Sequence, residues 1–194
     1  MRLHYMGKYN LDPASLPHGE HMPGAVKFRE ANDTGKLARI ANTMAVIIML
    51  AMAIPAAFRC GRYIVASPVQ ACLGFIAPVL TLFPHEFLHA VCFREDVYIY
   101  TNLSQGMLFV VGPEPLGKAR FVFMSLFPNI VFGFLPYAVG MIFPQCVFCL
   151  ALGVIAAGMG AGDYYNVFNA VTQMPGGAKT YLYQFNSYWY MPQD

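Results

Sequence analysis

Two histidines and a glutamate form an HEFLH run at His85, Glu86 and His89. In a helix, histidines four residues apart lie on one face, so both imidazoles can bind one zinc ion. The glutamate between them can then act as general base on a zinc-bound water. The run therefore predicts a catalytic zinc site.

The alternative interpretation is a pair of hydrogen-bonded core histidines beside an unrelated acid. The surroundings favour the metal site, because residues 80–93 are otherwise apolar and typical of a membrane span. Ionisable side chains are costly in lipid, and those found there usually serve a function.

A catalytic zinc needs a third protein ligand and an open position for water. Asp163 is the one charged residue between Phe121 and Ala170, which makes it the candidate. The alternative for an acid near a helix end is a cap or a surface group. Glycines at positions 158, 160 and 162 precede it, and small residues at this spacing let helices approach closely. A zinc-bound aspartate is also no longer an uncompensated anion in lipid.

Two asparagines are further candidates for the site. Asn166, one turn after Asp163, could orient that carboxylate or a substrate carbonyl, and an ordinary interhelical hydrogen bond explains it nearly as well. Asn129 is equally a polar link between helices or an amide that positions substrate.

The composition is that of a membrane protein. Hydrophobic residues make up 57% of the chain and charged residues 11%, with a mean hydropathy of +0.47. No basic tract with interleaved aromatics predicts a nucleic-acid partner. The expected partners are the lipid bilayer and a peptide or transmembrane protein substrate.

Four apolar stretches predict a mainly α, polytopic membrane protein with four transmembrane helices, since about 20 residues cross a bilayer. The stretches are residues 37–58, 63–93, 121–143 and 146–170. A polar turn at residues 59–62 is predicted to join the first two. Prolines interrupt the second stretch, and Pro84 is predicted to open a fresh helical segment that carries the HEFLH run.

The remaining segments are polar. Residues 1–36 are predicted to be a loop-rich cytosolic segment without the apolar core of a signal peptide. Residues 97–101 and 107–111 are predicted to form a hairpin with its turn at 102–106. The tail, residues 171–194, is aromatic and predicts an extended element, either an interfacial anchor or a lid.

Other potential metal or redox residues receive a plainer interpretation. His18 and His21 lie in the flexible first segment and are expected to be solvated. The five cysteines, at 60, 72, 92, 146 and 149, lack zinc-ribbon spacing and are expected to be small apolar residues. A redox or disulfide role for Cys146 and Cys149 is the alternative.

The distribution of positive charge predicts the topology. Ten of the twelve Lys and Arg residues lie in the first segment (counting Arg39 at its edge), the hairpin region or the tail, so both termini and the hairpin are predicted to be cytosolic. In this arrangement His85 in the second span and Asp163 in the fourth lie at matching depth. They are therefore expected to meet.

These residues resemble a known group, the integral-membrane zinc metallopeptidases of the site-2 protease type. The closer resemblance is to a bacterial family of zincin peptidases within that clan. It is carried by the PHEFLH run, the hairpin ending in Gly112, the SLFP run at 125–128, the GDYYN run at 162–166 and the aromatic tail.

The resemblance implies a four-helix membrane core that holds zinc through His85, His89 and Asp163, with Glu86 as the catalytic acid and base. The chain departs from the pattern of classical site-2 proteases, Asn-x-x-Pro followed by Leu-Asp-Gly. Here Gly162 and Tyr164 flank the aspartate. The departure bears on the residues that position substrate more than on the ligands.

The leading functional hypothesis is zinc-dependent hydrolysis of peptide bonds in membrane-associated substrates, at a bacterial cell membrane. The hairpin could hold an unwound substrate as an added strand. One alternative is a non-catalytic zinc-binding membrane scaffold or regulator, although Glu86 would then serve no purpose. Metal transport is disfavoured because no chain of polar residues crosses the spans.

Overall fold

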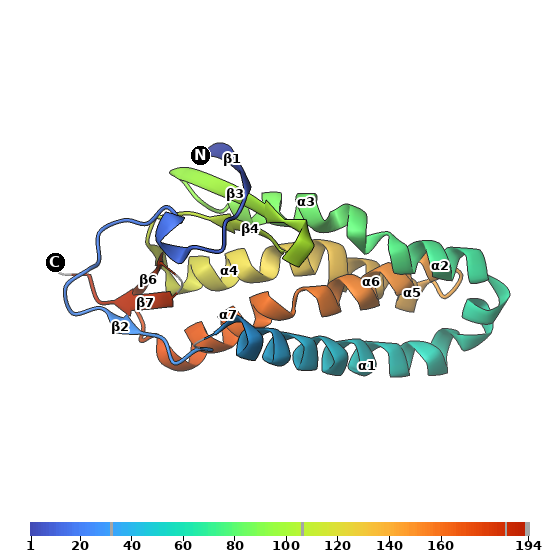
Figure 1. Cartoon of the computed structure of the whole chain (residues 1–194). Coiled ribbons are helices and arrows are strands. Elements are labelled where there is room, and N and C mark those ends of the chain that lie inside the picture. The colour runs from blue at the N-terminus through green and yellow to red at the C-terminus, as the bar shows by residue number, and fades with distance from the viewer. Residues whose placement is uncertain (32, 106, 185, 193–194) are drawn as a thin grey trace. The chain divides into compact units, whose positions relative to one another are not determined.

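In the computed structural model, helices make up 59% of the described residues. It describes residues 1–31, 33–105, 107–184 and 186–192. In chain order the elements are β1 (Arg2–Lys8), η1 (Pro13–Ser15), β2 (Val26–Lys27), α1 (Thr34–Ala66), α2 (Pro68–Ile76), α3 (Pro78–Ala90), β3 (Asp96–Asn102), η2 (Leu103–Gln105), β4 (Met107–Val111), β5 (Leu116–Gly117), α4 (Lys118–Asn129), the π-helix η3 (Ile130–Phe134), α5 (Leu135–Ile142), α6 (Val147–Met159), α7 (Ala161–Gln173), β6 (Lys179–Tyr183) and β7 (Asn186–Tyr190) (Figure 1).

Helix α1 runs further than the sequence pattern predicts. The prediction of a polar turn at residues 59–62 is wrong, because these residues are helical and α1 ends only at Ala66. Arginine is a good helix former, and a single glycine costs a helix only about 1 kcal/mol. The chain instead turns at Ser67, directly before Pro68 begins α2.

Helix α3 carries the HEFLH run in its last two turns. The prediction that Pro84 opens this helix is wrong, since α3 begins at Pro78 and Pro84 lies inside it. Proline suits the first position of a helix because its missing N–H would have no helical partner there. Pro78 is the earlier proline that meets this condition.

Among the described residues, three helical segments are long and apolar enough to cross a membrane: Thr34–Ala66, Pro68–Ala90 and Lys118–Ile142. A fourth candidate is the pair α6 and α7, which is bent by 53° at a short break. The predicted fourth span is therefore not one straight helix. Large apolar side chains remain exposed on these helices, with Phe58 90% and Leu80 80% accessible, a surface that suits lipid.

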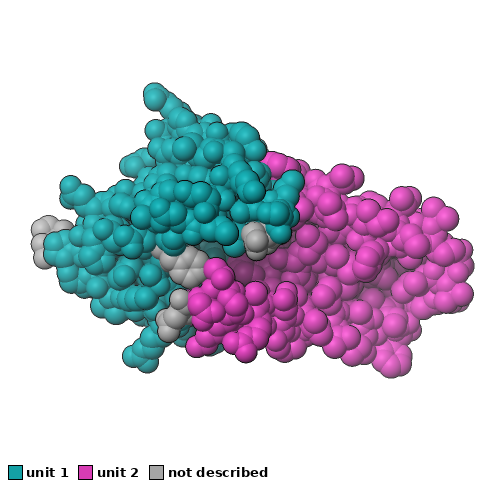
Figure 2. Space-filling model, viewed as in Figure 1, with its two compact units in different colours: residues 1–30, 86–125, 166–194 teal, residues 31–85, 126–165 magenta. Residues whose placement is uncertain are grey.

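One compact unit consists of residues 31–85 and 126–165 (Figure 2, magenta). It is helical, and glycines let its helices approach closely. A Cβ on Gly153 would lie 2.4 Å from the backbone nitrogen of Tyr137. Cys146 precedes α6 and Cys149 lies within it, and both are free thiols.

The other unit consists of residues 1–30, 86–125 and 166–194 (Figure 2, teal) and contains two sheets. The predicted hairpin is present, because β3 and β4 pair antiparallel; residue 106 of the predicted turn lies outside the described residues. Strand β1 pairs parallel with β3, so the first segment carries more structure than its loop-rich composition predicts.

The second sheet of this unit has the strand order β2-β7-β6-β5. The aromatic tail supplies its two inner strands; residue 185 of the predicted extended element lies outside the described residues. The hydroxyl of Tyr181 accepts a hydrogen bond from the Met22 amide at 3.0 Å and lies 3.0 Å from Nδ1 of His21. His21 lies beside the rings of Tyr183 and Tyr188 but is exposed, in agreement with the prediction of a solvated side chain.

Candidate metal centre

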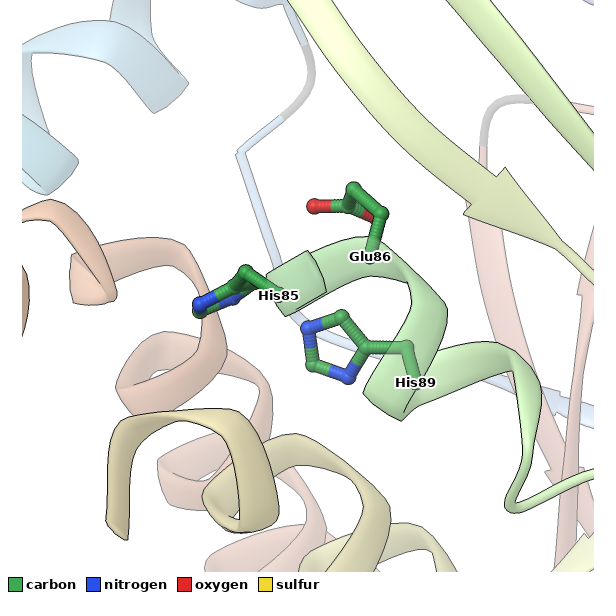
Figure 3. A group of neighbouring side chains, drawn as sticks. All are labelled: His85, Glu86 and His89. Atoms are coloured by element: carbon green, nitrogen blue, oxygen red, sulfur yellow. The ribbon is translucent and has the colours of Figure 1, made fainter. Parts of the chain in front are cut away.

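The last two turns of α3 bring three potential ligands together. The ligand atoms of His85, Glu86 and His89 all lie within 4.8 Å of one another (Figure 3). The spacing follows from the helix, because residues four apart lie one above the other on the same face. The three residues are half-buried or buried, so water has limited access to them.

The ring of His89 is held by a backbone carbonyl. Its Nδ1 lies 3.0 Å from the carbonyl oxygen of Met124 on α4, and the residue is only 8% exposed. A carbonyl can only accept a hydrogen bond, so Nδ1 carries the proton and donates it. When this ring is neutral, its lone pair is on Nε2, the nitrogen that can bind a metal.

His85 meets Asp163, as the matching depth of their spans predicts. Nε2 of His85 lies 3.1 Å from Oδ2 of Asp163, and the two side chains are 18% and 15% exposed. This distance is that of a hydrogen bond. It also approaches the separation of about 3.4 Å between ligands that share one tetrahedral zinc, given bonds of about 2.0–2.2 Å.

Asn129 supports Asp163 from a neighbouring helix. Its Nδ2 donates a hydrogen bond of 2.7 Å to Oδ2 of Asp163, and the residue is 1% exposed. Gly160 makes room for this side chain, because a Cβ there would lie 1.6 Å from Oδ1 of Asn129. Of the two interpretations of Asn129, the geometry matches a polar link that orients a candidate ligand. Asn166 is half-buried on α7, and its role stays a prediction.

A partly buried ion pair connects segments of the chain just beyond His89. Arg120 donates through Nε to the carbonyl of Cys92 at 2.8 Å, and its Nη1 lies 2.5 Å from Oε1 of Glu114. Oε2 of Glu114 also accepts from the Arg94 amide at 2.7 Å. Burial raises the pKa of Glu114, but the hydrogen bonds from Arg94, Arg120 and Glu95 outweigh it, so the pKa is lowered overall.

The donor set fits a zinc ion. Imidazole nitrogen and carboxylate oxygen are the ligands of catalytic zinc sites, commonly as two histidines and one carboxylate. The bond from His89 Nδ1 to a backbone carbonyl is the second contact that metal-binding histidines usually make. His85 and His89 could hold the ion; Asp163, which lies against His85, stays the predicted third ligand and Glu86 the predicted proton carrier.

The supporting roles of Met124 and Gly160 cannot be recognised from the sequence. Met124 acts through its backbone carbonyl, so its side chain carries no signal. Gly160 is one of three glycines before Asp163, and spacing alone does not distinguish it from Gly162, whose Cβ would meet nothing within 4 Å.

A family comparison also suggests zinc metallopeptidase chemistry. The sequence model of a family described as "Putative zincin peptidase" matches residues 78–179, just over half of the chain. The chain belongs to this family. In this zincin-family protein the matched segment begins with α3 and includes the HEFLH run and Asp163. No curated protein and no solved structure matches the chain.

Proposed function

We propose that this chain is an intramembrane zinc metallopeptidase of the site-2 protease type that hydrolyses peptide bonds of membrane-associated substrates. The observation that carries the proposal is the arrangement around α3. A buried histidine presents Nε2, a second histidine lies against an aspartate, and a carboxylate oxygen of Glu86 lies within 4.8 Å of a ring nitrogen of each histidine. Membership in the zincin peptidase family supports metallopeptidase chemistry at this turn.

The residues divide into ligands and a proton carrier. When bound, zinc lowers the pKa of a water ligand and polarises the scissile carbonyl. Glu86 takes a proton from the attacking water on a carboxylate oxygen and gives it to the amide nitrogen that leaves. Asn129 holds the carboxylate of Asp163 toward His85, so the ligands are oriented before metal or substrate arrives.

The substrate is a peptide in an extended conformation at the membrane. A helical transmembrane segment hides its carbonyls in internal hydrogen bonds, so it must unwind before hydrolysis. In the sheet β1-β3-β4, strand β4 is at the edge, and an unwound substrate could pair with it as an added strand. The positive charges outside the spans support cytosolic termini and a cytosolic hairpin.

The test is cleavage by the Glu86→Gln variant. Purified chain is reconstituted in liposomes with a reporter whose single transmembrane segment is interrupted by glycine and proline. Wild type is expected to cleave it, and Glu86→Gln is expected to slow cleavage at least about 100-fold at unchanged zinc content. Glu95→Gln, which alters an exposed acid a few residues after α3, is the matched control.

The outcomes separate the candidate functions. Equal cleavage by wild type and Glu86→Gln contradicts the peptidase. Stoichiometric zinc in a wild type that cleaves no membrane reporter would favour the non-catalytic zinc-binding scaffold.

A further inference from the structure

The carbonyl of Met124 lacks its usual helical donor. In an α-helix the carbonyl of residue i accepts from the N–H of residue i+4. For Met124 that residue is Pro128, which lies inside α4 and has no N–H. The chain therefore keeps a backbone acceptor available in the middle of an apolar helix.

This acceptor is the one that His89 uses. Nδ1 of His89 lies 3.0 Å from the Met124 oxygen, in a region where the imidazole is only 8% exposed. A second bond lies one turn earlier on α4, where Arg120 donates to the carbonyl of Cys92 at 2.8 Å. Two hydrogen bonds thus hold α4 against the end of α3 and keep the Met124 carbonyl directed at the ring.

We propose that Pro128 is a positioning residue for the metal site, because it reserves the Met124 carbonyl for Nδ1 of His89. This inference rests on the proposed function, since it concerns the same ligand. With the carbonyl available, the His89 ring is locked in the tautomer that carries its lone pair on Nε2. An N–H at position 128 would compete for the same oxygen from within the helix, and the ring would lose part of its orientation.

The proposed role of Pro128 and a role in packing predict different results for two replacements. Pro128 is fully buried, so its ring also fills space. A packing role depends on the ring, whereas the proposed role depends on the absence of the N–H. Replacement by alanine removes the ring and adds the N–H together. Replacement by the α-hydroxy acid analogue of alanine removes the ring but adds an ester oxygen, which cannot donate.

The experiment compares these two replacements in the full chain, in detergent. Zinc affinity is measured by competition with a chromogenic chelator, and the tautomer of His89 by nitrogen NMR of labelled histidine in the metal-free protein. Pro128→Ala is expected to weaken zinc binding about 10–100-fold, the usual effect of losing such a supporting contact. It is also expected to shift the His89 tautomer, whereas the α-hydroxy replacement keeps wild-type affinity and tautomer.

A control variant tests whether replacing any helical proline by alanine weakens zinc binding. Pro55 also lies inside a helix, α1, and Pro55→Ala is expected to leave zinc affinity unchanged. Equal loss of affinity in both replacements of Pro128 would assign the effect to packing and overturn the inference. So would wild-type affinity in Pro128→Ala. If Pro128→Ala does not fold, a loss of affinity in the α-hydroxy protein alone overturns it.

Failure of the proposed function would give a different zinc-binding result. A wild type that binds no zinc contradicts the metal site itself, whatever the Pro128 variants do. A wild type that binds zinc beside an unaffected Pro128→Ala contradicts only the role of Pro128.

Discussion

Oδ1 of Asn129 occupies the place where a side chain on Gly160 would begin. The Cβ of an alanine there would lie 1.6 Å from this oxygen, far inside contact distance. The backbone of Gly160 has φ −77° and ψ 15°, a negative-φ conformation open to residues other than glycine, so the glycine serves the close approach. Asn129 is 1% exposed and cannot swing into solvent.

Gly160→Ala is therefore expected to displace Asn129 from Asp163. The lost hydrogen bond to Oδ2 should lower zinc affinity about 10–100-fold. Overpacking should also lower the free energy of unfolding by about 1–3 kcal/mol. Chelator competition and thermal unfolding in detergent measure the two effects.

Gly162→Ala is the matched control, because it adds the same methyl group where nothing lies within 4 Å. It is expected to keep zinc affinity unchanged and not to lower the free energy of unfolding. Wild-type zinc affinity in Gly160→Ala would show that Asn129 does not orient Asp163.

The chemistry-bearing part of the site is predictable from sequence. The HEFLH spacing is a local property of one helix, and the lengths of two apolar stretches predict matching positions for His85 and Asp163, whose side chains lie 3.1 Å apart. Both inferences need only helical geometry and the length of apolar segments. The supporting contacts are not predictable in this way, since they depend on a backbone carbonyl at Met124 and on one glycine among three.

The wrong predictions about the fold have a common cause. Charge and glycine at residues 59–62 predict a turn, yet apolar runs on both sides keep the helix continuous to Ala66. The bend between α6 and α7 and the parallel pairing of β1 with β3 depend on contacts between distant segments. Local composition does not contain that information.

Asp163→Asn tests whether the carboxylate is a ligand. The amide keeps the size of the side chain but removes the negative charge that a zinc ligand supplies. Zinc affinity is expected to fall at least about 10-fold, whereas the helical content by circular dichroism is expected to stay the same. An unchanged zinc affinity would remove Asp163 from the ligand set.

The lowered pKa of Glu114 should make the stability of the fold depend on pH. Its pKa is lowered in the folded chain below the ordinary value of 4.5. A carboxyl of this kind stabilises the fold fully above its unfolded pKa, and the contribution is lost as the pH falls through the lower, folded pKa. The unfolding temperature of wild type is therefore expected to fall below about pH 4.5.

Glu114→Gln is expected to lose part of this dependence. At neutral pH it should be destabilised by roughly 1–3 kcal/mol, because the charge-assisted bond to Arg120 is lost. Glu95→Gln changes a neighbouring exposed acid and should follow wild type at every pH. Parallel curves for wild type and Glu114→Gln would contradict the assignment to Glu114.

Truncation after Gly177 separates the two interpretations of the aromatic tail. It deletes β6 and β7, the inner strands of the sheet β2-β7-β6-β5, and removes Trp189 from the cluster around Phe28. The unfolding temperature is expected to fall by roughly 10 °C, because several kcal/mol of packing are lost. Truncation after Met191 removes no strand and should keep the wild-type unfolding temperature. A Gly177 truncation that unfolds like wild type but cleaves the membrane reporter faster would favour a lid instead, since only a lid limits access without supporting the fold.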